Sequence, residues 1–342
     1  MMKVRSIRDV FIRSKEPFPY DWNKKGVLYA NQNLEVIQEV KGGVIQDNAV
    51  WYEDKNGDYY WSGGFQKIEE PELIEFKHLI DYSQLVKING ELPALGSRKT
   101  IIAILDTGIQ THPDLEEAVL EQRNFVSDND GAILPWHGTF MAGIIGGRTL
   151  LTRGVKGLAS NCEILDYKVL KDTGSTDMDA VKKALEYILH GGGPQPDIIN
   201  MSFSVRPGVI DSLMAEITAK GILVVGAGGR DNLFKDNNCS FLAKIPGVIS
   251  VGAAESVYLS NKESKYPEQI DFVYHNMKQW STYTSPSFYY QDQGDSIYTA
   301  ITSGLLAREI SFNDQADVFS LLKQKAFNIS EFNPETLKIY KL

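Results

Sequence analysis

The sequence of 342 residues has few cysteines and no long hydrophobic run. Its two cysteines, Cys162 and Cys239, cannot crosslink a chain of this size, and they suit a reducing compartment. No stretch of about 18 apolar residues occurs, so no membrane span is expected. The first residues are basic but lack the apolar run of a signal peptide. We therefore expect a cytoplasmic protein, with export as a second possibility.

Positive charge is also scarce. Lys and Arg number 35 against 44 Asp and Glu, which gives a formal net charge of −9. An acidic chain without a basic cluster excludes nucleic acid as the main partner. Apolar residues make up 43% and charged residues 23%, which is typical of a globular protein. The composition therefore indicates a globular protein that binds neither nucleic acid nor membrane, and no cofactor is expected.

The sequence changes character near residue 75. We expect a lead-in over residues 1–24 and a small β-barrel-like module over residues 25–70. In the segment AVWYEDKNGDYYWSGGF, Asn56-Gly57 predicts a hairpin turn because both residues accept a positive φ. The module resembles the Src-homology-3-like barrels of bacterial enzymes, which makes it a candidate partner-binding unit. Its aromatic side chains are interpreted either as ligand-binding residues or as the core of the barrel; they are Trp51, Tyr59, Tyr60 and Trp61.

Residues 71–342 alternate between apolar runs and helical patterns. Runs that are apolar at every position predict parallel strands buried on both faces. They are Ile101–Leu105, Ile164–Leu170, Asp197–Met201, Ile222–Val225 and Val248–Val251. The helices expected between or after them are Gly138–Ile145, Asp177–Leu189, Val209–Lys220 and Ile297–Glu309. This order predicts an α/β fold with a doubly wound parallel sheet and helices on both faces.

Two polar residues stand where predicted strands or loops end. Asp106 ends the first strand, in IIAILDTGIQTHPDL, and His137 opens a helix in WHGTFMAGIIGG. The helix dipole disfavours added positive charge at that place, so we expect a neutral imidazole suited to a general base. Considered alone, Asp106 fits a turn-capping role as well as a catalytic one. Considered alone, His137 fits a hydrogen-bonded structural histidine better than a catalytic base.

A serine opens another predicted helix. Ser296 follows Gly294-Asp295 in QGDSIYTAITSGLLA. Alone, such a serine is more often an N-cap than a nucleophile. As a nucleophile, its hydroxyl would lie beside backbone N–H groups that stabilise an oxyanion.

Together these three segments resemble the subtilisin family of serine peptidases, in motif and in the order Asp, His, Ser. Further similar stretches are GVKGLASNCEILDYKVL, DIINMSFS and GILVVGAGG, so the resemblance covers about residues 78–342. It implies a peptidase domain over residues 71–342 that cleaves a peptide or protein substrate through an acyl-enzyme. Ser296 would attack the carbonyl, His137 would carry the proton, and Asp106 would orient the imidazole.

The oxyanion region departs from the family pattern. The family reads AAGN where this chain has Gly226-Ala227-Gly228-Gly229, so Gly229 replaces the Asn that donates to the oxyanion. Losing one such donor costs about 10²–10³-fold in rate. Arg230 and Asn232 follow closely, and either is a candidate to reach into the site.

The serine motif and the substrate strand depart as well. Asp295 precedes the serine where the family has Thr, and Tyr298 is bulky where the family has a small residue. A carboxylate there would repel an oxyanion if it pointed inward. The family's Ser-x-Gly-Gly strand lacks both glycines here, which predicts a reshaped specificity pocket. The residues expected to bind substrate or oxyanion are Ser202, Phe203, Ser204, Gly228, Gly229, Asn232 and Ser296 itself.

Family members often bind calcium, but the matching loop here, GGRTLLTRG, has few side-chain oxygens and two arginines. We expect no metal at that loop and Asp114 as an orphaned ligand.

Two hypotheses follow from the site as a whole: an active peptidase of narrow specificity, such as one that processes a precursor peptide, or a pseudopeptidase that binds a peptide or a partner. An esterase or amidase is a weaker third, because a GxSxG elbow is absent.

Overall fold

The computed structural model has two compact units, Met1–Ile74 and Glu75–Leu342. It describes residues 2–28, 32–67, 79–82, 94–127, 136–149, 153–230, 238–254, 267–276, 278–284, 289–313 and 317–326.

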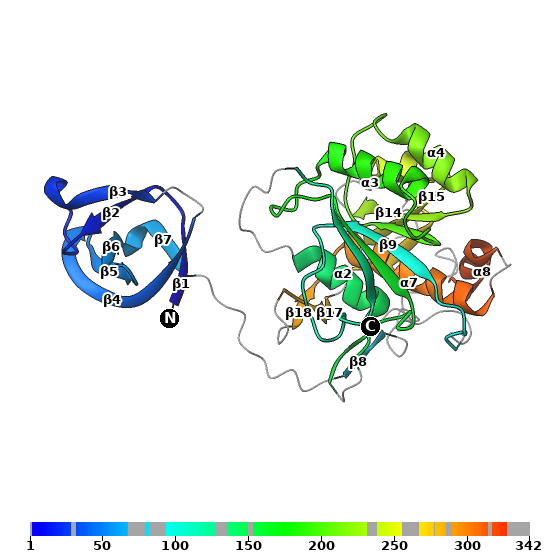
Figure 1. Cartoon of the computed structure of the whole chain (residues 1–342), viewed down its shortest axis with the longest axis horizontal. Helices are drawn as coiled ribbons and strands as arrows, with labels where there is room; N and C mark the ends of the chain where they lie inside the picture. The colour runs from blue at the N-terminus through cyan, green and yellow to red at the C-terminus, as the bar shows by residue number, and fades with distance from the viewer. Residues whose placement is uncertain are drawn as a thin grey trace. The chain divides into compact units, whose positions relative to one another are not determined.

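The first unit is an antiparallel sheet of seven strands in the order β3-β2-β6-β5-β4-β1-β7, curled around on itself (Figure 1). The strands are β1 Met2–Ser6, β2 Val10–Ser14, β3 Lys24–Leu28, β4 Asn33–Ile45, β5 Asn48–Asp54, β6 Asp58–Trp61 and β7 Phe65–Lys67. The expected lead-in over residues 1–24 is therefore wrong. β1 lies between β4 and β7, and Val4 and Val10 are core residues of this unit, so the early residues belong to the sheet.

The hairpin predicted at Asn56-Gly57 joins β5 to β6. Only Gly57 takes a positive φ, at 72°. The Asp54 side chain accepts from the backbone N–H groups of Asn56 and Asp58, so a carboxylate holds the turn. The tight turn with two positive φ angles is the preceding one, at Gln46 and Asp47.

The aromatic residues of this hairpin serve mainly as core. Trp51 and Tyr60 are buried, and the indole N–H groups of Trp51 and Trp61 donate to backbone carbonyl oxygens. The exposed aromatic residues lie elsewhere. Trp22 is 64% exposed and stacks on Tyr20 with ring centroids 5.8 Å apart.

The second unit is built on a parallel sheet of seven strands in the order β10-β12-β9-β13-β14-β15-β16. The strands are β9 Ile101–Asp106, β10 Val119–Asn124, β12 Glu163–Lys168, β13 Ile198–Met201, β14 Leu223–Arg230, β15 Val248–Ala254 and β16 Phe272–His275. All five predicted strands are present in it. Two small sheets accompany it, β8 Leu79–Asp81 with β11 Gly154–Lys156 and β17 Gln279–Thr282 with β18 Tyr289–Asp292.

Helices cover both faces of this sheet, as a doubly wound fold requires (Figure 1). They are α2 Trp136–Gly146, α3 Met178–His190, α4 Asp211–Ala219, α7 Asp295–Phe312 and α8 Val318–Lys325. Successive residues of β9 point to opposite faces: Ile102 and Ile104 join the core under α2 and α7, whereas Ala103 and Leu105 join the core under α3 and α4.

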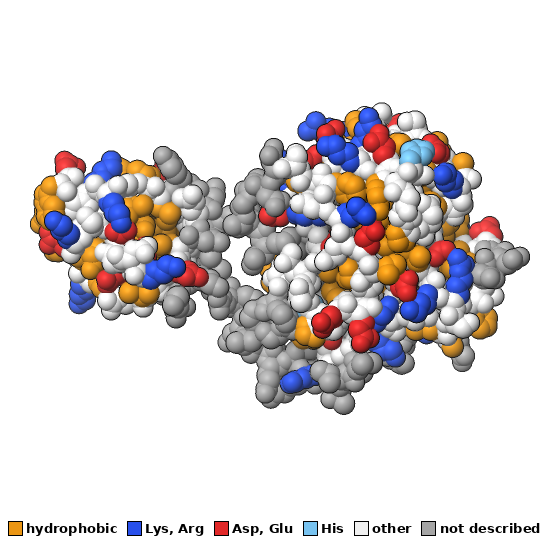
Figure 2. Space-filling view, viewed as in Figure 1, with side chains coloured by type: hydrophobic (Ala, Val, Ile, Leu, Met, Phe, Trp, Pro, Cys, Tyr) orange, Lys and Arg blue, Asp and Glu red, His pale blue; other side chains and the backbone are white. Residues whose placement is uncertain are grey.

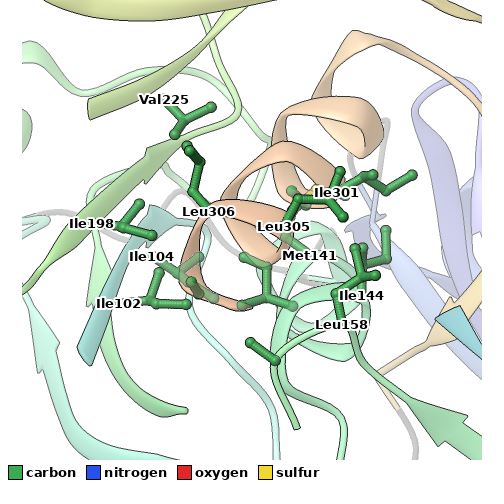
Figure 3. Close-up of a cluster of buried hydrophobic side chains, with 14 of the residues drawn as sticks. Ile102, Ile104, Met141, Ile144, Leu158, Ile198, Val225, Ile301, Leu305 and Leu306 are labelled. Carbon is green, nitrogen blue, oxygen red and sulfur yellow. The ribbon is translucent and has the colours of Figure 1, made fainter. Parts of the chain in front are cut away.

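Helix α7 is the central helix of one face. Ile301, Leu305 and Leu306 contact a core that includes the strands and α2 (Figure 3). Because α7 is buried on nearly all sides, its apolar residues are not confined to one stripe, and hydroxyl side chains such as Ser303 are buried among them. This packing fixes the start of the helix, and with it Ser296.

The charged side chains are mixed in sign. On the faces that Figure 2 shows, Lys and Arg are interspersed with Asp and Glu. Among the described residues, those faces therefore carry no basic stripe of the kind that tracks a nucleic-acid backbone. None of the described helices combines the length and the apolar character needed to cross a bilayer.

Candidate active site

Asp106 is the last residue of β9 and is fully buried. Its Oδ1 accepts from the backbone N–H of Thr107 at 2.7 Å. Gly108 turns the chain away with a φ of +94°, a conformation that side chains disfavour. The carboxylate is thus fixed at the carboxyl edge of the sheet, where open α/β folds place their sites.

His137 lies in the first turn of α2 and faces Asp106. Its Nδ1 is 2.9 Å from both carboxylate oxygens. The two elements can approach because residue 138 is glycine; a Cβ there would lie 2.5 Å from the carbonyl oxygen of Gly108. The backbone N–H of Gly138 also donates to Thr107 Oγ1 at 3.0 Å. The pair is therefore positioned by backbone contacts as well as by its own hydrogen bond.

The pKa of His137 is shifted in the direction opposite to the one that the helix dipole alone predicts. Burial lowers the pKa of the imidazole, but Asp106, with Asp292 and Asp295 further away, raises the pKa above its ordinary value of 6.5. The argument from the helix dipole left out these three carboxylates, which outweigh it in the pKa of the imidazole. A raised pKa is what a base needs when it must hold a proton during a reaction.

Ser296 is in the first turn of α7, on the same edge of the sheet. The cap position is Gly294, with no side-chain capping bond, so Ser296 is not the N-cap of this helix. Its hydroxyl donates to the backbone carbonyl of Ser202 at 2.9 Å, and the Ser202 hydroxyl donates to the Ser296 carbonyl at 3.0 Å. No hydrogen bond between Ser296 and His137 is present in this structure, where both residues are described.

A buried polar network joins α7 to β13 and was not predicted from the sequence. Ser303 Oγ donates to Asn200 Oδ1, and Asn200 Nδ2 donates to Ser202 Oγ, both at 2.9 Å. The signal for it was Asn200, a polar residue inside the apolar strand IINM. The network fixes Ser202 against Ser296.

The predicted substrate strand is only partly available to a ligand. Phe203 and Val205 are buried in the core under α3 and α4, so they do not line a pocket. Ser204 is exposed, and Ser202 is buried. Of the two replaced glycines, therefore, Ser204 alone faces solvent.

The oxyanion region is rebuilt around β14. Gly229 follows a bulge in that strand and has a φ of +114°, where a side chain is strained. Gly228 lies against β15, where a Cβ would approach the Val251 carbonyl oxygen at 3.1 Å. Arg230 Nε lies 3.7 Å from Asp295 Oδ1. Asn232, the other candidate donor, lies outside the described residues.

Asp114 is not the orphaned ligand that we expected. Its Oδ2 accepts from the Val155 backbone N–H at 2.8 Å and from the Tyr289 hydroxyl at 2.9 Å. In the nearby loop, the Arg148 guanidinium donates to the carbonyl oxygens of Glu117 and Cys162. Protein donors thus use the oxygens that a cation would need. Across the described ranges, no group of three or more His, Cys, Asp or Glu side chains could hold a metal.

Sequence reasoning also missed Asp166 of β12. It is 4% exposed; its Oδ2 accepts from the Ile109 N–H and from Gln122 Nε2, and its Oδ1 has no partner among the described residues. Burial raises its pKa to about 7. It lines a cavity of about 420 Å³ with Thr107 and Lys168, next to Asp106.

An aromatic cluster borders His137. Trp136 contacts Tyr283 and Tyr290 with ring centroids 5.8 and 6.0 Å apart, and Tyr290 is 40% exposed. The hydroxyls of Ser281 and Thr282 in β17 donate to carbonyl oxygens of α2. The β17–β18 hairpin thus forms an aromatic wall beside the imidazole.

The fold and the site define a doubly wound α/β protein with Asp, His and Ser gathered at the carboxyl edge of its sheet. The model of the subtilase family matches residues 97–333, so this chain belongs to that family.

Curated relatives include a thermophilic serine proteinase of a Bacillus species, 30% identical over 62% of this chain and 52% of the relative. Halolysin of Haloferax mediterranei is 30% identical over 69% of this chain and 46% of the relative. The chain thus spans about half the length of these relatives.

Solved structures agree on the fold. The structure of sphericase is similar with a TM-score of 0.56 and 23% identity, over 71% of this chain and 88% of that one. A cold-adapted subtilisin-like serine proteinase has a TM-score of 0.56 and 21% identity, over 72% of this chain and 93% of that one. At this identity the likeness supports the subtilisin-like fold alone.

Proposed function

We propose that this protein is a serine endopeptidase of narrow specificity. The observation that carries the proposal is the His137 Nδ1 within 2.9 Å of both oxygens of the buried Asp106 carboxylate. This contact leaves Nε2 as the nitrogen that can accept a proton. Ser296 stands at the helix start on the same edge of the sheet.

In the proposed reaction, the Ser296 hydroxyl first leaves the Ser202 carbonyl by rotating about its Cα–Cβ bond. Its oxygen attacks the peptide carbonyl carbon while His137 Nε2 takes the proton. The C–N bond then breaks, and the amine leaves with that proton. Water attacks the resulting ester through the same base and frees Ser296.

Narrow specificity is supported by the walls of the site. Trp136 packs against His137, and Tyr283 and Tyr290 pack against Trp136. Ser204 replaces a glycine on the substrate strand. Bulky side chains beside the reacting groups exclude substrates that do not match them. Such a site suits the processing of one precursor peptide better than general protein digestion.

A pseudopeptidase that binds peptides is the second candidate. The Ser296–Ser202 hydrogen bond and the glycine at position 229 favour it, because a nucleophile bonded away from its base and a missing donor both oppose turnover.

Labelling of the purified protein with a fluorophosphonate separates the two candidates. The peptidase predicts labelling that Ser296→Ala abolishes, with hydrolysis falling by on the order of 10⁶-fold. Ser320→Ala is the matched control, because Ser320 also lies in the first turn of a helix, on α8 away from the site, and should label as the wild type does. A folded wild-type protein that does not label would favour the binding protein.

A further inference from the structure

Gly229 has no side chain that could donate a hydrogen bond to an oxyanion. Its φ of +114° goes with the bulge in β14, so substitution by Asn would strain the backbone. An active peptidase at this site therefore needs a donor from a neighbouring residue. The next residue, Arg230, ends β14 and has a side chain that is 57% exposed.

The Arg230 guanidinium lies over the start of α7. Its Nη2 is 3.8 Å and its Cζ 3.9 Å from the position that a Cβ on Gly294 would occupy. Gly294 is the cap residue of α7, two residues before Ser296. The guanidinium is thus beside the helix turn whose backbone N–H groups surround the nucleophile.

This placement needs a counter-charge, because the start of a helix repels a cation. Asp295 provides it: the carboxylate is mostly buried, at 15% exposure, and Oδ1 lies 3.7 Å from Arg230 Nε. Asp295 also raises the pKa of His137, so its charge reaches the imidazole. Unpaired, it would repel an oxyanion. Arg230 therefore relates to two separate departures from the family motif. It is a candidate donor in place of the one that Gly229 lacks, and it neutralises the charge of Asp295.

We propose that Arg230 donates from its terminal guanidinium nitrogens to the oxyanion that forms when Ser296 attacks, while Asp295 holds Nε. A guanidinium has five N–H donors in a rigid fork, so pairing at Nε leaves both terminal nitrogens available. This assignment rests on the proposed peptidase function. It replaces a neutral amide donor with a cation and cancels the charge of the neighbouring carboxylate.

The test compares Arg230→Ala and Arg230→Lys with wild type in peptide hydrolysis and in the rate of fluorophosphonate labelling. We expect Arg230→Ala to lower kcat and the labelling rate by about 10²-fold with KM changed less than about threefold, as the loss of an oxyanion donor does. Added guanidinium ion should restore part of the rate. Arg98→Ala is the matched control, since Arg98 is also partly exposed and ion-paired, to Asp197, just before β9 begins at the other edge of the sheet.

A double variant separates donation from charge cancellation. Arg230→Ala/Asp295→Asn should recover only part of the rate lost in Arg230→Ala; full recovery would mean that Arg230 merely neutralises Asp295, and would overturn the assignment. A labelled, active wild type that is insensitive to Arg230→Ala, or a change in KM alone, would overturn it too. A folded wild type that neither labels nor hydrolyses would overturn the proposed function and this assignment with it.

Discussion

The two halves of the site are built differently. The Asp106–His137 half is held by contacts within and between two short motifs: the Thr107 N–H on the carboxylate, the Gly138 N–H on Thr107, and the close approach that Gly138 allows. The Ser296 half depends on more distant segments, with Ser202 and Arg230 approaching Asp295 and Ser296 at the start of α7. The Asp106–His137 half keeps the family motif closely, whereas the Ser296 half departs from it.

Removal of the carboxylate that orients the imidazole is expected to cause the largest loss of activity, and it tests the Asp106–His137 half directly. Asp106→Asn keeps the shape of the side chain but favours the wrong imidazole tautomer, so we expect kcat to fall by about 10⁴-fold. The measurement is steady-state hydrolysis of a peptide substrate. Asp114→Asn is the control, because that buried carboxylate accepts from Val155 and Tyr289 and contacts neither His137 nor Ser296. Equal losses in the two variants would mean that Asp106 acts through stability alone.

The difference between the halves also explains what the sequence could predict. Asp106 and His137 stand in short segments, each beside the glycine that its backbone requires, so both position and neighbours were visible. The partners of Ser296 come from β13 and β14, and no local pattern pairs Arg230 with Asp295 or Ser296 with Ser202. Long-range electrostatics were equally hidden: the pKa of His137 rises because Asp292 and Asp295 act together with Asp106.

Elsewhere in the fold, too, the sequence predicted what a local pattern determines and missed what depends on contacts between distant segments. Continuous apolar runs located the parallel strands because burial on both faces leaves a direct sequence pattern. The first residues carry no such pattern; β1 is a strand because β4 and β7 pair with it on either side. Asp114 was misjudged for a similar reason, since its donors Val155 and Tyr289 come from other segments.

The pH dependence of activity sharpens the comparison, because His137 is influenced by carboxylates from both halves. Asp106, Asp292 and Asp295 raise the pKa of the imidazole, and only its neutral form acts as base. We expect kcat/KM to fall tenfold per pH unit below a midpoint that lies above 6.5. Asp292→Asn should move that midpoint to lower pH with little change in the plateau. A midpoint unchanged by Asp292→Asn would show that the Asp292 carboxylate does not act on the imidazole.

The smallest expected effect concerns Asp166, which lies behind Asp106 and is used by neither half. Burial raises the pKa of Asp166 to about 7, so the folded protein keeps this proton to a higher pH than the unfolded chain does. Its contribution to stability is present below its unfolded pKa, near 3.8, and is lost as pH rises through about 7. Asp166→Asn removes this dependence while keeping one acceptor for the Ile109 N–H. The free energy of unfolding of the variant relative to wild type should therefore increase from pH 5 to pH 8, by at most about 1.4 kcal/mol for each unit of pKa shift. Urea denaturation at the two pH values measures it, and kcat at the plateau should change less than about tenfold. A difference that stays constant between pH 5 and pH 8 would mean that Asp166 is ionised in the folded protein. Its negative charge would then add to that of Asp106 in its effect on the imidazole of His137.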